Sequence, residues 1–267
     1  SSCFLWHVLQ RELAVARLQT DFVAAVSHEF RTPLTALRHV TELLEESDDL
    51  PPERRRSFYQ ALGRSTERLH RLVETLLDFS RMEGGRKPYD LRMLDAAALV
   101  AQVAADFERD VTSRGFAINV RVDRVNTQIR ADAEALTHAL WNLLDNAVKY
   151  SPEGNAVDIA VHGHPSGLAI SVLDRGLGIP AHERRDIFQR FVRGEQATRL
   201  GIKGTGLGLA MVSHVVQAHR GTLDVQSAEG AGSTFTIVLP AEPGAAQAPT
   251  PDALTSTDFE RSEPGIR

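Results

Sequence analysis

The chain has 267 residues, 42% of them hydrophobic, which is enough for one large domain or two modest ones with apolar cores. Its formal net charge is -5 at pH 7, and basic residues are interspersed with acidic ones. No basic stripe or patch stands out, which argues against a nucleic-acid partner and against binding to a membrane surface. The single cysteine, Cys3, excludes an internal disulfide framework and fits a reducing compartment.

The chain opens on a short apolar segment, residues 3–9. No segment reaches the roughly 20 apolar residues that span a bilayer. The opening segment fits either an ordinary helix start or the last turns of a transmembrane helix that begins earlier. Because the first residue is serine, we expect a fragment of a longer protein, with residues 1–15 following a missing transmembrane or sensor region.

A long helix is predicted from Leu9 to Ser47. Its apolar residues alternate three and four positions apart, as in the heptad seam of a helix that packs against other helices. His28 lies farthest from this seam and is predicted to face solvent. Pro33 removes a backbone hydrogen bond at a cost of about 3 kcal/mol, so we expect a bend there. The seam residues are Val23, Val26, Phe30, Pro33, Leu37, Val40 and Leu44.

Turn formers and prolines at 48–52 separate this helix from a second one, which Gly84 and Gly85 end as a C-cap pair would. One hairpin with an apolar seam on each arm cannot bury both seams alone. The economical solution is a homodimer that forms a four-helix bundle, so we predict an all-α dimerisation domain over residues 16–85. The second seam consists of Phe58, Leu62, Ser65, Leu69, Leu72, Leu76 and Phe79.

From residue 86 to residue 240, strands and helices interleave. Because the strands join by hairpins, the pattern favours a two-layer α+β domain over a parallel sheet. The tail, 241–267, is rich in small and polar residues and is predicted to be disordered. Helices are predicted at 95–114, 133–150, 181–191 and 205–218, and strands at 116–122, 127–130, 157–161, 167–173, 222–227 and 233–239.

Three segments of this second region carry residues suited to a nucleotide. The helix 133–150 places Asn142, Asn146 and Lys149 on one face. Amide oxygens are ligands for Mg²⁺, and an ammonium group can meet phosphate. Taken alone, this pattern fits an ordinary exposed helix face equally well.

The other two segments are rich in glycine. Asp174 directly follows a strand, where a buried carboxylate can accept a hydrogen bond from the exocyclic amine of adenine, and Gly176 and Gly178 let backbone approach a flat ring. The alternative is an ordinary turn. The segment 203–208 opens a helix, and its glycines expose backbone N–H groups that suit phosphate. A lone GxGxG motif is weak evidence.

The segment from Ser27 to Leu34 (SHEFRTPL) closely resembles the phospho-acceptor box of bacterial two-component sensor histidine kinases. The asparagine helix, the Asp174 segment, the run 187–193 and the glycine segment 203–208 resemble, in this order, the N, G1, F and G2 boxes of that family's ATP-binding domain. The resemblance extends from about residue 21 to residue 240. It implies the Bergerat α/β sandwich, with ATP held beneath a mobile lid.

The resemblance also implies roles at the matching positions. Asp174 would bind the adenine amine, Asn146 with help from Asn142 would ligate Mg²⁺, and Lys149 and Tyr150 would contact the phosphates and the nucleotide edge. The remaining implied nucleotide-binding residues are Gly176, Gly178, Phe191, Lys203, Gly204, Thr205, Gly206, Leu207 and Gly208.

Arg193 precedes the presumed lid, 194–203, and resembles the arginine that reaches the terminal phosphate. Two positions depart from the family pattern. Arg175 stands where asparagine is frequent, and Lys203 stands where glycine is frequent. These departures bear on the ribose and lid contacts that the resemblance implies.

The implied reaction is in-line transfer of the γ-phosphoryl group of ATP to a ring nitrogen of His28, while Glu29 accepts the proton of the other ring nitrogen. Mg²⁺ and Arg193 would neutralise charge. The phosphoryl group would pass to an aspartate of a response regulator receiver domain docked below His28. Glu29 and Thr32 also resemble the pattern of regulator phosphatases, in which Thr32 orients water; otherwise Thr32 merely faces solvent.

Two alternatives to a protein-histidine kinase share parts of this pattern. A conformational machine like gyrase or Hsp90 hydrolyses ATP with a glutamate where this chain has Asn142. A catalytically silent dimeric scaffold would have lost nucleotide-binding residues, whereas Asn146 and Asp174 are in place. The sequence therefore predicts a kinase core in the cytoplasm, attached to the bacterial inner membrane only through a missing N-terminal region.

Overall fold

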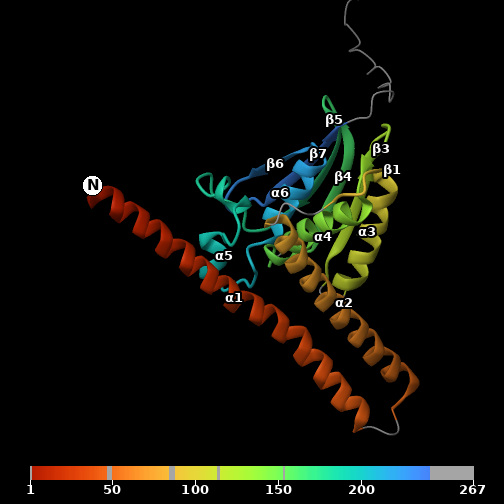
Figure 1. The fold of residues 1–267 in the computed structure, drawn as a ribbon. Helices are drawn as coiled ribbons and strands as arrows, with labels where there is room; N and C mark the ends of the chain where they lie inside the picture. The colour runs from red at the N-terminus through yellow and green to blue at the C-terminus, as the bar shows by residue number, and fades with distance from the viewer. Residues whose placement is uncertain (1, 47–49, 84–87, 113–114, 153, 241–267) are drawn as a thin grey trace, which may run out of the picture.

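The computed structural model describes two parts, a long helical hairpin and an α/β domain that pack side by side (Figure 1). The hairpin consists of α1 (Ser2–Glu45) and α2 (Pro52–Glu83). Within the described part of the chain, none of the helices has the length and apolar character needed to cross a membrane. The described residues are 2–46, 50–83, 88–112, 115–152 and 154–240.

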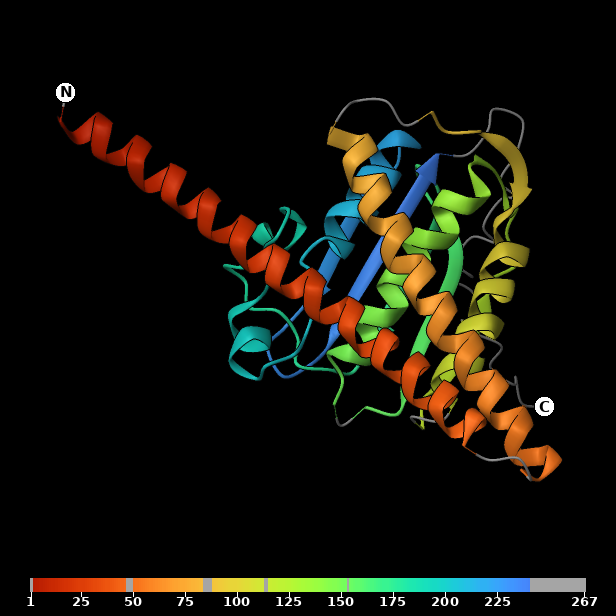
Figure 2. The same ribbon diagram turned by 60° about the horizontal axis from the view of Figure 1, so that its bottom comes forward.

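The first helix is longer than predicted. It begins at Ser2 rather than Leu9, and it continues through Pro33, so the proline does not end it. Its N-terminal part projects beyond the rest of the molecule (Figure 2). The predicted cap at Gly84 and Gly85, like the predicted disordered tail, lies outside the described residues.

The seams of the hairpin are only partly covered by this one chain. Most seam residues are half-buried between the two helices, but Val23 is 61% exposed. Tyr59 and Leu77 also expose apolar surface. A hairpin that is half-covered in this way has the apolar surface that the predicted four-helix bundle requires.

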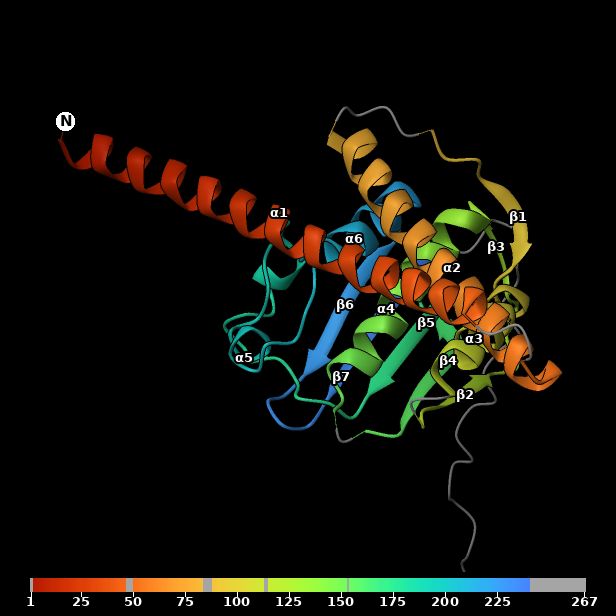
Figure 3. The same cartoon turned by 90° about the horizontal axis from the view of Figure 1, so that it is seen from below.

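The α/β domain is a two-layer structure in which a five-stranded sheet is covered on one face by α3, α4 and α6 (Figure 3). The strand order is β2-β4-β5-β7-β6, and β1 and β3 form a separate antiparallel pair. The hairpin lies against the outer side of the helical layer (Figure 2). The elements are β1 (Arg92–Asp95), α3 (Ala96–Val111), β2 (Ala117–Val122), β3 (Gln128–Ala131), α4 (Ala133–Lys149), β4 (Ala156–His164), β5 (Gly167–Asp174), α5 (Glu195–Arg199), α6 (Gly208–Ala218), β6 (Thr222–Ser227) and β7 (Ser233–Pro240).

The two-layer architecture matches the prediction, but the connectivity differs at one edge. β2 pairs with β4 in parallel, from Ala117 opposite Ala156 to Val122 opposite Val161. Hairpins do join β4 to β5 and β6 to β7, as predicted, but not β2 to β4. Parallel strands need a long crossover connection, and β3 with α4 supplies it between β2 and β4.

The segment 181–191 is not the predicted helix. It forms turns and a single 3-10 turn at Asp186–Phe188, and Ile187 is buried against the core while also lining a cavity. Two short elements were not predicted: the helix α5, which follows this segment, and the strand β1, which lies earlier in the chain. α6 begins at Gly208 rather than Thr205, because residues 204–207 form a loop against α4.

The local sequence accounts for the ends of the helices that carry the site. Asp95 caps α3 by accepting hydrogen bonds from the N–H groups of Ala97 and Ala98, and Asp132 caps α4 through Ala135. The Asp132 N–H also donates to Nε2 of the buried His219 at 2.9 Å, which ties the start of α4 to the end of α6. These contacts define the first turns of α3 and α4 and place α4 beside α6.

Candidate functional site

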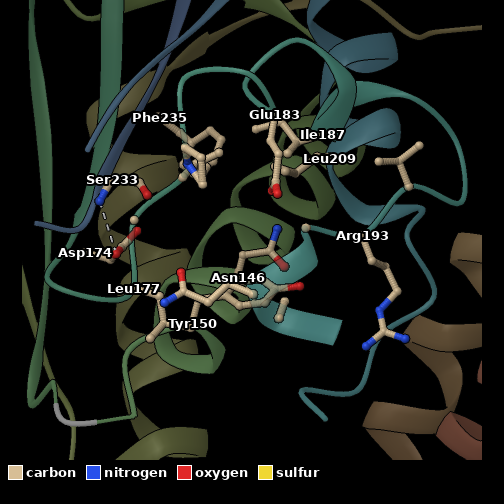
Figure 4. Close-up of a pocket in the computed structure, with 17 residues that line it drawn as sticks. Asn146, Tyr150, Asp174, Leu177, Glu183, Ile187, Arg193, Leu209, Ser233 and Phe235 are labelled. Atoms are coloured by element: carbon tan, nitrogen blue, oxygen red, sulfur yellow. Dashed lines mark hydrogen bonds between the residues drawn. The ribbon is translucent and has the colours of Figure 1, made fainter. Parts of the chain in front are cut away.

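Two adjoining cavities lie between α4, the end of β5, the start of β7 and the segment 187–209, and Figure 4 shows the one that Asp174 lines. Their volumes are about 90 and about 130 Å³. Both are lined by Asn146, Tyr150 and Arg193, so they are the two ends of one cleft. We call them the Asp174 end and the glycine-loop end. The apolar wall of the Asp174 end includes Leu177, Ile179, Ile187, Leu209 and Phe235.

Asp174 is buried at the end of β5. Its Oδ1 accepts a hydrogen bond from the N–H group of Gly176, at 2.9 Å, and one from the N–H group of Ser233, at 3.2 Å, which Figure 4 shows. Burial raises the pKa of this carboxyl above its usual range, and the two N–H groups act in the opposite direction. A carboxyl group oriented in this way beside apolar walls suits a flat ring that carries an amine.

The glycines after Asp174 serve the packing of the protein. A Cβ on Gly176 would lie 2.2 Å from the carbonyl oxygen of Tyr150, and a Cβ on Gly178 would lie 1.9 Å from that of Ala228. Gly178 also has a positive φ of 68°, which favours glycine. The sequence assigned these glycines to close approach of a ring, whereas here their bare Cα atoms face other backbone.

The glycine-loop end is formed where α4 meets residues 204–208. Asn142, Asn146 and Lys149 lie on one face of α4 and line this end, as the helical spacing predicts. The loop approaches so closely that a Cβ on Gly208 would lie 3.1 Å from Oδ1 of Asn142, and a Cβ on Gly204 would lie 3.3 Å from Nζ of Lys149. Two amides, an ammonium group and exposed loop backbone therefore share one small space.

Four of the predicted nucleotide-binding residues line neither end of the cleft. They are Gly176, Phe191, Lys203 and Leu207. Leu207 is fully buried and anchors the loop, and the side chain of Lys203 is exposed. Thr205 lines the cleft, and its hydroxyl accepts a hydrogen bond from the Leu207 N–H.

Phe191 connects the cleft to the hairpin. Its backbone has a positive φ of 66°, and its N–H donates to the Gly206 carbonyl at 2.9 Å. The Phe191 ring packs against Phe22 of α1, with centroids 4.6 Å apart, and against Phe79 of α2, with centroids 5.5 Å apart. We call these three rings the aromatic contact. The residue that supports the glycine loop therefore also touches both hairpin helices.

Arg193 lines both ends of the cleft and extends away from Asp174 (Figure 4). Its guanidinium donates to the carbonyl of Ile202, and its buried Nε has no hydrogen-bond partner in the structure. An unsatisfied buried donor beside a cavity suits an incoming anion. Arg175, which departs from the family pattern, pairs with Asp158 at 2.8 Å on β4.

His28 is exposed on α1, as the heptad pattern predicts. Thr32, one turn later, is also exposed and donates its hydroxyl to the His28 carbonyl at 3.3 Å. Glu29 behaves differently: it is only 7% exposed, and its carboxylate lies 3.2 Å from the guanidinium of Arg68 on α2. Glu29, and not His28, lines the glycine-loop end of the cleft.

Both parts of the chain match known families. Residues 131–243 match the family of histidine kinase-, DNA gyrase B- and HSP90-like ATPases, and residues 18–85 match the His Kinase A (phospho-acceptor) domain. The chain belongs to the two-component sensor histidine kinases. The match to the phospho-acceptor domain distinguishes this chain from DNA gyrase B and HSP90, whose ATPase family it shares.

Curated histidine kinases resemble this chain over most of its length. The sensor-like histidine kinase SenX3 of Mycobacterium tuberculosis (strain H37Rv) is 38% identical over 223 residues, which are 83% of this chain and 53% of the relative. The sensor histidine kinase WalK of Bacillus subtilis is 36% identical over 82% of this chain and 36% of the relative. The chain thus spans about half or less of the length of these relatives.

Solved histidine kinases share the fold. Full-length ShkA in complex with AMPPNP aligns with a TM-score of 0.58 and 31% identity, over 84% of this chain and 46% of that chain. The histidine kinase AdeS of Acinetobacter baumannii aligns with a TM-score of 0.55 and 25% identity, over 81% of this chain and 98% of that chain. The ATP-binding domain of this histidine kinase chain is therefore the Bergerat sandwich that the resemblance implied.

Sequence reasoning missed several residues of this histidine kinase site. Ser233 and Phe235 on β7 line the Asp174 end, and their two-residue spacing on a strand is a signal that they share a face. Asp145 and Thr75 line the glycine-loop end. Nothing local marks Arg68, which reaches Glu29 from a position 39 residues away.

Proposed function

We propose that this chain is the kinase core of a two-component sensor, which takes the γ-phosphoryl group of Mg-ATP onto His28 and passes it to an aspartate of a response regulator. One observation carries the proposal. The same chain exposes His28 on a phospho-acceptor hairpin and contains a cleft with Asp174 at one end and a glycine loop at the other.

ATP fits the two ends of the cleft in one orientation. The adenine ring would lie between the apolar walls with its amine toward Asp174, and the phosphates would lie at the glycine-loop end near Lys149 and Arg193. Backbone N–H groups and cations stabilise phosphate charge. The AMPPNP complex of ShkA, a relative with 31% identity, supports this choice of nucleotide.

The donor set also fits Mg²⁺. Asn142 and Asn146 present amide oxygens at the glycine-loop end, and Gly208 leaves room for Oδ1 of Asn142 beside the loop. Magnesium prefers such hard oxygen ligands and keeps several waters. When bound, it would neutralise phosphate charge during transfer.

In the transfer step, a neutral ring nitrogen of His28 attacks the γ-phosphorus. The nitrogen–phosphorus bond forms while the bond to the leaving oxygen of ADP breaks, and the proton on the other ring nitrogen passes to Glu29. In the structure, Glu29 is held by Arg68, and His28 is exposed and does not line the cleft. Transfer within one chain therefore requires the hairpin and the ATP-binding domain to change their relative position, whereas transfer across the dimer would use the His28 of the other copy.

Labelling with γ-labelled ATP and Mg²⁺ tests the proposal. His28→Ala should abolish acid-labile, alkali-stable label on the protein, whereas His39→Ala, which removes another exposed histidine of α1, should keep it. Nucleotide binding should persist in both variants because neither residue lines the cleft. Label that remains without His28 would overturn the kinase assignment.

A regulator phosphatase activity is a second candidate, favoured by the position of Thr32. Its hydroxyl lies one turn from His28 on the exposed face of α1. Thr32→Ala should slow dephosphorylation of the regulator and leave autophosphorylation nearly intact. Thr41→Ala is the matched control, since Thr41 also donates its hydroxyl to the carbonyl four residues earlier. Equal dephosphorylation rates in both variants would remove this candidate.

We further propose that the active form is a homodimer. Val23 and other apolar residues of the hairpin remain exposed in one chain, and a second copy would cover them in a four-helix bundle. The response regulator would then dock on the bundle below His28.

A further inference from the structure

Glu29 places a negative charge at the end of the cleft that is otherwise built for anions. The cavity wall around it contains Lys149, Arg193 and the glycine loop, with Asp145 as a second acidic side chain. Tyr150 lines the same cavity; burial raises its pKa, Arg193 acts in the opposite direction, and the negative charges of Asp145 and Glu29 add to the rise. Because Glu29 is 7% exposed, water screens its charge poorly.

The hairpin holds Glu29 in this position. Arg68 pairs with its carboxylate, and Leu72 and Thr75 of α2 line the same cavity, so the hairpin forms one wall of the glycine-loop end. We call this arrangement of hairpin and domain the docked arrangement.

Contacts outside the cavity maintain the docked arrangement. The aromatic contact joins both hairpin helices to Phe191, and Arg190 lies over the ring of Phe79 at 5.5 Å. Farther along α2, the guanidinium of Arg71 lies 4.1 Å from the ring of Trp141 on α4. Glu29 is therefore fixed relative to the glycine loop by several independent contacts.

We propose that Glu29 makes the docked arrangement discriminate between nucleotides by their number of phosphates, so that it disfavours ATP more than ADP. The inference rests on the proposed function, since it assumes that the glycine-loop end receives the phosphates. A carboxylate beside the terminal phosphate opposes its charge, whereas ADP leaves that position empty. Glu29 does not line the adenine end, which is formed around Asp174.

This discrimination gives one carboxylate two roles in two arrangements. In the docked arrangement the charge of Glu29 opposes that of the triphosphate. In the arrangement in which the phosphoryl group is transferred to His28, Glu29 accepts the proton of His28. Because ATP and docking oppose each other, ATP favours the arrangement in which Glu29 has left the cavity. Binding of ATP therefore favours the departure of Glu29 from the cavity, which makes its carboxylate available to accept the His28 proton.

Nucleotide titrations on the full chain test the inference. Glu29→Gln should tighten ATP binding by about threefold to tenfold, tighten ADP binding less, and leave AMP binding unchanged. Glu67→Gln is the matched control, because Glu67 also lies on the hairpin and pairs with an arginine but does not line the cleft. Isothermal calorimetry in Mg²⁺, repeated in EDTA, supplies the dissociation constants.

A second variant separates charge from docking. Phe22→Ala weakens the aromatic contact without changing any residue that lines the cleft. Phe22→Ala alone should raise the ratio of ATP to ADP affinity. Glu29→Gln should then raise this ratio by a smaller factor in the Phe22→Ala background than in the wild type. Full additivity of the two effects would show that the discrimination does not depend on docking.

The outcomes distinguish this inference from the proposed function. If the wild type binds ATP but Glu29→Gln leaves the ratio of ATP to ADP affinity unchanged, the inference fails and the kinase assignment stands. If Glu29→Gln weakens ATP binding only in Mg²⁺, the carboxylate holds the cation instead, and the inference also fails. If the wild type binds no adenine nucleotide, the proposed function itself is wrong.

Discussion

The hairpin and the α/β domain differ in what they bury. The α/β domain has an apolar core in which residues such as Leu140 and Ile170 are almost fully buried. Among the described side chains of the hairpin, only three reach comparable burial, and two of them, Glu29 and Asp78, are acidic. Both acidic side chains have partners: Glu29 pairs with Arg68, and Asp78 lies 3.9 Å from His138 of α4.

This difference separates a self-sufficient region from one that depends on partners. The ATP-binding domain closes its own core, and residues of this domain alone line the Asp174 end of the cleft, whereas the hairpin supplies one wall of the glycine-loop end. The hairpin leaves its apolar seam half-covered and meets the domain through charges and a few aromatic rings. Such contacts are weaker than a continuous core, which agrees with the change of relative position in the proposed transfer step.

The largest effect is expected in the core of the α/β domain. Leu140→Ala should lower the free energy of unfolding by about 2–5 kcal/mol, because it leaves a cavity among well-packed neighbours. Leu200→Ala in the same domain should change it little, since that side chain is 57% exposed. Urea denaturation followed by circular dichroism measures both. Similar losses in the two variants would contradict a closed core.

The next largest effect is expected on ATP affinity, from a substitution in the cleft. Asp174→Asn should weaken ATP binding by about 10- to 100-fold, as expected for the loss of a hydrogen bond to a charged group. Asp158→Asn, which removes a carboxylate of β4 outside the cleft, should have little effect. The ATP dissociation constants of the two variants, measured by calorimetry, test whether the adenine amine donates a hydrogen bond to Asp174.

The pH dependence of ATP affinity is a second test of the role of Asp174. Only the ionised form of Asp174 is a full acceptor, and burial raises its pKa. ATP affinity of the wild type should therefore fall as the pH is lowered through this raised pKa, which lies above the usual value of about 4. The Asp174→Asn variant should lack this loss; a wild-type affinity independent of pH in this range would argue against the assignment.

A smaller effect is expected at the exposed seam of the hairpin. Val23→Lys should raise the dissociation constant of the homodimer by about tenfold or more, because burial of a valine contributes about 1.5–3 kcal/mol. Val122→Lys is the control, because Val122 is an exposed valine on β2 of the α/β domain. Sedimentation velocity over a concentration series measures both. If Val122→Lys dissociates the dimer and Val23→Lys does not, the interface belongs to the domain.

The smallest effect is local to a helix end. Asp95→Ala should cost about 1 kcal/mol of stability, because Asp95 caps α3 and also accepts a hydrogen bond from Thr127. Those hydrogen bonds lower the pKa of Asp95, so its stabilisation is present above the usual aspartate pKa and is lost as the pH falls through the lowered one. Asp224→Ala, on the exposed face of β6, is the control, and thermal melts at several pH values test both.

Elements with strong local signals were predicted well, and those that depend on distant partners were not. The heptads, the asparagine helix and the β6–β7 hairpin carry their own periodicity. β1 has no such pattern and exists because β3 pairs with it, and the parallel pairing of β2 with β4 follows from the crossover between them. The helix predicted at 181–191 failed because Ile187 turns into the cavity wall rather than onto a helix face.

The same division holds for the site. The sequence by itself determined which residues are available, since His28, Asn146, Asp174 and the glycine loop follow from motifs whose spacing reflects one helix face, one strand end or one turn. Only the tertiary structure decided that Glu29 pairs with Arg68 and lines the cleft while His28 faces outward. The reason is physical: periodicity fixes the face of an element on which a side chain lies, but its partner depends on how separate elements pack, over distances in sequence that local patterns do not encode.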